Sequence, residues 1–459
     1  MTELVERVGC KVIITLNDGT EIDVSLATVG SLSNITNYIA SINLVESTNT
    51  ANQNPVGVVS SNTLKIVLKS NDRSLIPDNE ESIYYGKMDN TAIINVTLED
   101  DDGEVEFNTF YISSWVSNTT SSNPNQVTIE ATDLLSIINK NSVPSSELLK
   151  NVSTNEIFIS TINKLNESLE NKYKIQYDVS DINFGAYPTL EITNFEADRM
   201  GTWFNILSQS TLTNIYYTRD NKLVTDYCLD DTAGESVCNL SDKVNITNAS
   251  VDRGGLVGYT GVKVNYILNT INNLTELTTL REQVLNPGDN TFDNIDLGNK
   301  IYKLGYVSVK TDSKTVIEVV SLTYGKNTAT IVLRNNTESA ISCDISIFGQ
   351  TLKENKLFVT RTKSNSSNEI LEVTNSIVPV GYINKFANEL LSLIGIKASA
   401  LKISGFFNPR IKLGDIVYVD VESSINTKGY YKVIELNWKI SNTIKCDAKV
   451  IKTIVQGGV

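Results

Sequence analysis

The sequence predicts a mainly β protein of several domains, with a small α+β domain near its middle. Two observations predict this class. Apolar and polar residues alternate in many short runs separated by turn residues, and helical spacing is concentrated in residues 146–240. The 459 residues suffice for about three domains, and a content of 41% hydrophobic and 20% charged residues is typical of folded globular proteins.

Residues 1–145 predict a first β domain, either a barrel or a sandwich. Its first feature is a hairpin, in which Val12, Ile14 and Leu16 alternate along one strand and Asp18-Gly19 supplies the turn. Further β runs follow at residues 64–68, 92–98, 105–115 and 127–131. The acidic run 99–104 lies between two of these strands, so we expect its carboxylates to be fully solvated at a hairpin tip.

Residues 146–240 predict the α+β domain. Ser153 and Glu156 have the spacing of a capping box at the start of a helix. A second helix begins at Thr202 and is followed by two short strands around the turn 218–221. Behind the capping box, one buried helix face is predicted by the spacing of Phe158, Ile162, Leu165 and Leu169.

The rest of the chain is again β-rich. Residues 241–266 together with 376–459 predict a second β domain, residues 267–375 an inserted β domain, and residues 382–394 one helix. The clearest part is a C-terminal antiparallel meander. It consists of a loop closed by Asn408-Pro409, a turn at Gly414-Asp415 and strands over residues 416–420, 429–436 and 443–450.

The order of these segments resembles that of phage tail hub proteins, the central baseplate hub or tail-associated proteins of phage and phage-like tails. One part of the resemblance is a helix that precedes a hairpin of Tyr-x-Asp-x-Asp-Gly-Lys-Leu character. This chain has Arg219-Asp220-Asn221 where Asp-Gly is commoner, and Asn tolerates the left-handed backbone of a tight turn. The residues that carry the pattern are Trp203, Asp220, Leu223, Asn408, Pro409, Leu413, Gly414, Asp415, Gly429 and Tyr430.

The resemblance implies two tube-type β-barrels, one from residues 1–145 and one from residues 241–266 and 376–459, with 267–375 inserted. It implies a homotrimer at the virion tail tip or baseplate, made in the bacterial host cytoplasm. Three subunits with two barrels each would form a pseudo-sixfold ring that adapts a sixfold tail tube to a threefold spike or fibre. The implied partners are the tail tube or distal tail protein, the spike or fibre, the tape-measure protein, and DNA that passes through without specific binding.

Chemical catalysis has little support in the sequence. The absence of histidine excludes Ser-His-Asp and Cys-His catalysis and His-ligated zinc. Asp289, Asp293 and Asp296 lack the closer spacing and terminal Glu of a calcium loop. We therefore assign no catalytic, cofactor-binding or metal-binding residue and expect a protein that is not an enzyme.

Net charge, cysteine spacing and hydropathy limit which other classes of protein the chain could belong to. A net charge of −14 argues against stable binding to the outside of nucleic acid. The spacing of Cys228 and Cys238 would permit a hairpin disulfide, but we expect two unconnected thiols in a reducing cytosol. No apolar run is long enough for a membrane span. A receptor-binding or adhesin-type tail protein, and a cell-wall glycosidase that uses only carboxylates, remain alternatives to the hub.

Overall fold

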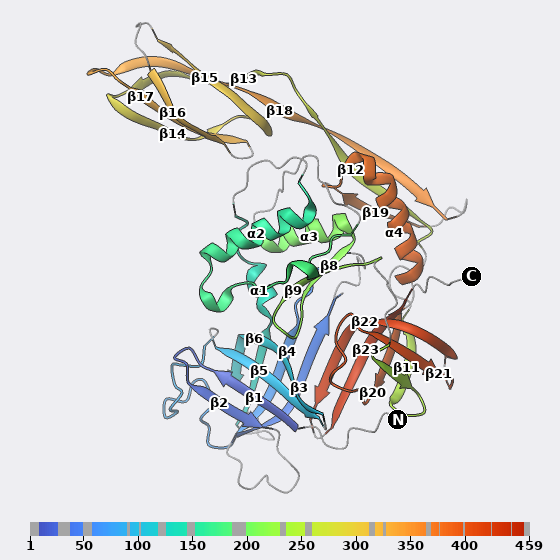
Figure 1. Ribbon diagram of the computed structural model, residues 1–459. Coiled ribbons are helices and arrows are strands. Elements are labelled where there is room, and N and C mark those ends of the chain that lie inside the picture. The colour runs from blue at the N-terminus through green and yellow to red at the C-terminus, as the bar shows by residue number, and fades with distance from the viewer. Residues whose placement is uncertain are drawn as a thin grey trace.

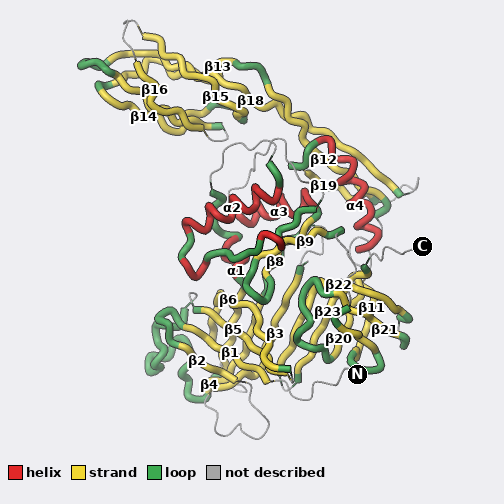
Figure 2. The backbone as a smooth tube through the Cα atoms, viewed as in Figure 1, coloured by secondary structure: helices red, strands yellow, loops and turns green. Residues whose placement is uncertain are grey.

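The protein is described from a computed structural model of the whole chain (Figure 1). It confirms a mainly β, multidomain fold with a small α+β domain. In the part of the chain that the structure describes, the helices lie in the middle of the molecule and beside the base of the inserted region, and the other regular elements are strands (Figure 2). The structure describes residues 9–25, 37–48, 57–89, 92–100, 102–117, 125–144, 152–185, 199–229, 236–252, 259–311, 317–324, 327–363, 369–375, 377–397, 400–423, 425–441 and 443–453.

Seven strands form the first half of the main sheet. The predicted hairpin is confirmed: its two strands pair in antiparallel fashion, and Gly19 takes the positive φ of 84° that the turn requires. Alternate residues along these strands are buried, as expected for a sheet with one face in a core. The strands are β1 (Gly9–Thr15), β2 (Glu21–Ser25), β3 (Asn37–Ser47), β4 (Thr63–Ser70), β5 (Ile93–Asp100), β6 (Gly103–Ser117) and β7 (Gln126–Thr132).

Six strands form the second half. The C-terminal meander is confirmed, because its three strands pair successively in antiparallel fashion. A fourth strand extends the sheet beyond the meander on one side, and a short parallel strand borders it on the other. The strands are β10 (Cys238–Ser241), β11 (Ile246–Asp252), β20 (Ala400–Gly405), β21 (Ile416–Val421), β22 (Thr427–Ile440) and β23 (Ile444–Lys452).

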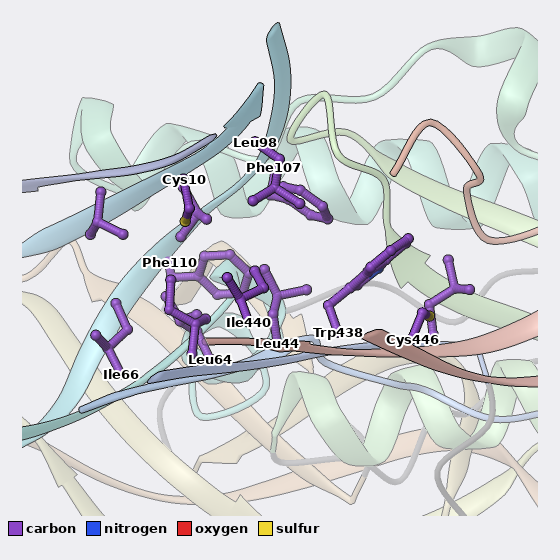
Figure 3. Packing of buried hydrophobic residues seen from close by; sticks show 14 of the residues in the cluster. Cys10, Leu44, Leu64, Ile66, Leu98, Phe107, Phe110, Trp438, Ile440 and Cys446 are labelled. Atoms are coloured by element: carbon purple, nitrogen blue, oxygen red, sulfur yellow. The ribbon is translucent and has the colours of Figure 1, made fainter. Parts of the chain in front are cut away.

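The two halves are joined edge to edge into one sheet. Strand β22 pairs with β3 over six residues, placing Trp438 opposite Leu44. Both halves share one hydrophobic core, in which Phe107 meets Trp438 edge to face with ring centroids 6.3 Å apart (Figure 3). Among the described strands, the pairing closes neither half into a barrel by itself.

The middle domain packs two helices against a two-stranded hairpin. The capping box is confirmed: the Glu156 amide donates to Ser153 Oγ at 3.1 Å, and the Ser153 amide donates to the Glu156 carboxylate at 3.3 Å. The rings of Phe158 and Trp203 stack between the two helices, with centroids 5.9 Å apart. The elements are α1 (Leu134–Ile138), α2 (Thr154–Ser168), two 3₁₀ turns (Asn171–Tyr173 and Val179–Asp181), α3 (Met200–Thr211), β8 (Thr213–Tyr217) and β9 (Leu223–Tyr227).

The inserted region forms an arm that projects from the rest of the molecule (Figure 1). Its longest strand, β18 (Ile341–Thr362), has 22 residues and would extend about 70 Å. Residues 341–351 of β18 pair with β13 and β15 in the outer part of the arm, and residues 352–362 pair with β12 at its base. The other strands are β12 (Gly261–Ile271), β13 (Thr275–Leu285), β14 (Gly288–Asp296), β15 (Ile301–Thr311), β16 (Ile317–Tyr324), β17 (Thr328–Asn335) and β19 (Ile370–Asn375).

The base of the arm shares a hydrophobic core with the middle domain, to which Leu212 and Tyr227 contribute. After the 3₁₀ turn Val380–Tyr382, helix α4 (Ile383–Lys397) packs against β12 and β18 through Phe386 and Leu390. The domain boundary expected at residue 266 falls inside β12, so residues 261–266 share a sheet with the inserted region. The helices in the described ranges are all too short or too polar to span a bilayer.

Candidate assembly site at the junction of the domains

A tight turn of the middle domain, residues 218–222 between β8 and β9, reaches the junction of the two halves of the sheet. The Thr218 amide donates to the Lys222 carbonyl at 2.9 Å, and Asn221 adopts a left-handed φ of 56°. Asp220 lies at the exposed tip, while Leu223 is fully buried in the middle-domain core. Asn221 therefore adopts the left-handed conformation that the sequence predicted it would tolerate.

The Asn221 side chain also anchors the turn to the first half of the sheet. Its Oδ1 accepts a hydrogen bond from the Thr109 amide of β6 at 2.7 Å. Beside it, Asn108 Nδ2 donates to the Thr218 carbonyl at 2.8 Å. A glycine would permit the same backbone but would leave the Thr109 amide without this acceptor. The departure from Asp-Gly thus has a positive structural role in this chain.

The loop that precedes β21 is shaped by its own side chains. Asn408 Oδ1 accepts from the Arg410 amide at 2.8 Å, and the Asp415 carboxylate accepts from the Lys412 amide at 2.7 Å. Gly414 has a φ of 86° and donates to the Val433 carbonyl at 2.9 Å, which ties the loop to β22. Burial raises the pKa of Asp415, and the hydrogen bond from the Lys412 amide opposes that rise.

Arg219 brings the turn and the loop together. Its guanidinium donates to the carbonyl oxygens of Pro409 and Ile411, the latter at 2.9 Å, although these residues lie 190 and 192 positions away in the sequence. The sequence analysis marked the turn and the loop as distinctive, but it assigned Arg219 no role other than as part of an unusual turn sequence. Burial of Arg219 was not predictable, because an arginine in a tight turn is usually solvated.

The other residues of the sequence pattern contribute to the cores and to strand β22. Trp203 is buried in the middle-domain core, and Leu413 packs against the core of the main sheet. Gly429 and Tyr430 lie on β22, where the Tyr430 ring is 41% exposed and meets the Tyr418 ring with centroids 5.2 Å apart. These residues support the fold locally.

One expectation about the acidic run is wrong. Asp100 was expected to be solvated, but its side chain is only 3% exposed. Arg410 of the second half donates two hydrogen bonds to it, at 3.1 and 2.8 Å, because the junction brings this loop over the end of β5. Among the calcium candidates, Asp289 pairs with Arg334 at 2.7 Å. No disulfide joins Cys228 and Cys238.

Comparison with known proteins identifies the fold. No protein-family model and no curated protein matches the sequence. The structure is similar to a tail protein from Neisseria meningitidis MC58, with a TM-score of 0.53 at 10% identity over 97% of both chains. It is also similar to the 43 kDa tail protein of prophage MuSo2 from Shewanella oneidensis, with a TM-score of 0.51 at 10% identity over 96% of both chains. The chain therefore has the fold of phage tail proteins, as its sequence resemblance predicted.

Proposed function

We propose that the chain is a structural hub at the distal end of the tail tube of a phage or phage-derived particle. The observation that carries this proposal is the edge-to-edge union of two β halves in one sheet, through the pairing of β3 with β22. A subunit with two such halves lets three copies present six units to a sixfold tube and threefold symmetry to a spike or fibre. The similarity of fold to two tail proteins over nearly the whole chain supports the same role.

The proposed mechanism is assembly around a channel for DNA. Among the described strands, the edges of the main sheet are β2, β11 and the short β10, and closure of a ring is one way to cover exposed sheet edges. A chain with a net charge of −14 suits a surface past which DNA slides without being held. In this mechanism the protein acts through geometry and charge, without a reaction, and binds no cofactor.

The native mass of the purified chain tests the oligomer. We expect light scattering to give three times the 50.6 kDa of one chain, and negative-stain images of that species to show a ring with a central opening. A monomer at all concentrations, both alone and with the neighbouring tail proteins, would contradict the ring.

The proposed partners are the tail tube or distal tail protein above the ring, and the spike or fibre and the tape-measure protein below it. Co-expression of the chain with each protein, followed by affinity purification, should recover complexes of defined stoichiometry. In the assembled particle, antibody labelling should place the chain at the tail tip or baseplate. Failure to bind any of these proteins would argue against the hub.

The arm supports a second candidate, a receptor-binding or adhesin-type tail protein. It has its own hydrophobic core and projects from the body (Figure 1), and it exposes large apolar side chains such as Tyr306 and Phe358. An adhesin should bind host cells or glycans by itself without a ring, whereas a hub should form a closed ring and bind tail-tube and spike proteins. A turbidity assay on host cell walls tests the carboxylate glycosidase alternative, for which we expect no clearing.

A further inference from the structure

Three ion pairs at the junction each connect a different pair of structural units. The units are the first half (β1–β7), the second half (β10, β11 and β20–β23) and the middle domain (α1–α3, β8 and β9). Each ion pair joins residues that are far apart in the sequence, so none can form before the units have docked. The pairs are Arg219–Glu46 at 2.6 Å between middle domain and first half, Lys432–Asp226 at 2.8 Å between second half and middle domain, and Arg410–Asp100 at 2.8 Å between second half and first half.

The Arg219–Glu46 pair is the most deeply buried of the three. The two side chains are 2% and 3% exposed, whereas the Lys432 side chain is 11% exposed and the Arg410 side chain 41%. Arg219 Nε and Nη2 donate to the two carboxylate oxygens of Glu46 at 2.8 and 2.6 Å. This two-point contact fixes the plane of both groups as well as their distance.

The surroundings of this pair involve all three units. The Arg219 guanidinium lies over the Phe107 ring of β6, 4.2 Å from its centroid. Trp438 Nε1 of β22 donates to Glu46 Oε2 at 3.1 Å. The guanidinium also lies 5.9 Å from the centroid of the Trp438 ring. With the carbonyls of Pro409 and Ile411, Arg219 therefore has partners from the first half and from two segments of the second half.

A buried ion pair of this kind contributes little net stability, because the cost of removing two charges from water offsets their attraction. Its directional hydrogen bonds nevertheless penalise every other arrangement of the same groups, because any shift leaves a buried charge without partners. We propose that Arg219 is a positioning residue, which holds the two halves of the sheet and the middle domain in one fixed arrangement. The guanidinium fork is what this role requires, since a lysine ammonium cannot reproduce its planar set of donors.

Hydrogen exchange of the full-length Arg219→Lys variant tests this proposal. Two amides report on the junction: Thr109 donates to Asn221 Oδ1 at 2.7 Å, and Thr48 donates to the Ile434 carbonyl at 2.9 Å. A third amide, Ile175, donates to Asn166 Oδ1 at 2.8 Å inside the middle domain and serves as an internal reference. We expect exchange at Thr109 and Thr48 to accelerate about tenfold in the variant, with Ile175 unchanged.

The matched control is Ile162→Val, which shortens a fully buried side chain inside the middle domain, away from the junction. It should lower the melting temperature without accelerating exchange at the Thr109 and Thr48 amides more than at Ile175. Equal acceleration of all three amides in both variants would show that Arg219 only adds stability, and would overturn the proposal. If Arg219→Lys does not fold, Glu46→Gln takes its place, since it keeps one acceptor and removes the charge.

The exchange experiment is read within one chain, so it does not depend on ring formation. The role of Arg219 in assembly rests on the proposed hub function and is tested by the native mass of the same variants. A monomeric wild-type protein with selective exchange in Arg219→Lys would reject the ring and keep the positioning role. A wild-type trimer, combined with equal acceleration of all three amides in Arg219→Lys, would support the ring and reject the positioning role.

Discussion

At the residue scale, several residues near the junction both shape the local backbone and form contacts with another segment. Asn221 supplies both a left-handed backbone and the acceptor for Thr109, and Gly414 supplies the positive φ that lets its amide reach Val433. Asp133 caps helix α1 through the Leu135 amide and also accepts from the Asn62 amide at 2.7 Å. Single residues thus set the local backbone conformation and also hold distant segments together.

Replacing Asn221 separates these two contributions. Asn221→Gly keeps the turn conformation and removes the acceptor for the Thr109 amide, so we expect a loss of about 1 kcal/mol in the free energy of unfolding. Asn221→Ala should cost roughly 1 kcal/mol more, because alanine has a Cβ but lacks the short polar side chain with which asparagine tolerates a φ of 56°. Urea unfolding of both variants measures the difference, and equal losses would contradict this division.

Asp133 gives a prediction for pH. Burial raises the pKa of its carboxyl group from 3.8 to about 7, against the opposing hydrogen bonds from the Asn62 and Leu135 amides. Because the folded pKa lies above the unfolded one, this group's contribution to stability is full below pH 3.8 and is lost as pH rises through about 7. The neighbouring titratable groups, Tyr111 and Tyr217, also have raised pKa values, so they stay neutral in this range.

Urea unfolding as a function of pH checks this expectation. Between pH 3.8 and 7, the wild-type free energy of unfolding should fall more steeply with rising pH than that of Asp133→Asn. Parallel curves for the two proteins would show that Asp133 does not titrate in this window.

At the scale of elements, local signals explain most of the helices and strands. Helix α2 begins where the capping box predicts, and its buried face includes Phe158, Ile162 and Leu165. The three strands of the meander follow from alternation and from the turn at Gly414. Strand β18 differs, because one continuous strand serves two sets of neighbours along its length, and only tertiary pairing selects them.

Removal of the helix cap tests the contribution of α2. Ser153→Ala removes the acceptor for the Glu156 amide and should lower the free energy of unfolding by about 1 kcal/mol. Lys164→Ala, at an exposed position of the same helix, is the control and should be nearly neutral. Thermal unfolding followed by circular dichroism compares the two variants. Equal shifts of their melting temperatures would show that the cap contributes no more than an ordinary helix position.

At the scale of the whole molecule, the body and the outer part of the arm have separate cores. The body is built around the sheet shared by the two halves, whereas the outer arm has a cluster of its own that includes Leu333 and Ile345. Residues 261–375 also contain equal numbers of acidic and basic residues, so the net negative charge of the chain lies outside the arm. The two parts therefore differ in electrostatics as well as in packing.

Separate cores predict separate unfolding transitions. Ile345→Ala should destabilise the arm by about 3 kcal/mol, and Trp438→Ala should destabilise the body by about 4 kcal/mol, because each leaves a cavity. Calorimetry should show that each substitution moves a different transition. A single transition that both substitutions shift would mean that the arm and the body unfold as one unit.

Local patterns were enough to predict the secondary elements, the β-rich class and the resemblance to tail hub proteins, because alternation, helical spacing and turn chemistry act within a few neighbouring residues. The same patterns marked the turn 218–222 and the loop before β21 as distinctive. Three facts came from the folded arrangement instead: these segments meet, β22 pairs with β3, and Asp100 is buried. The physical reason is sequence distance: Glu46 lies 173 residues from Arg219 and 392 from Trp438, and no local pattern encodes which distant polar groups will satisfy one another.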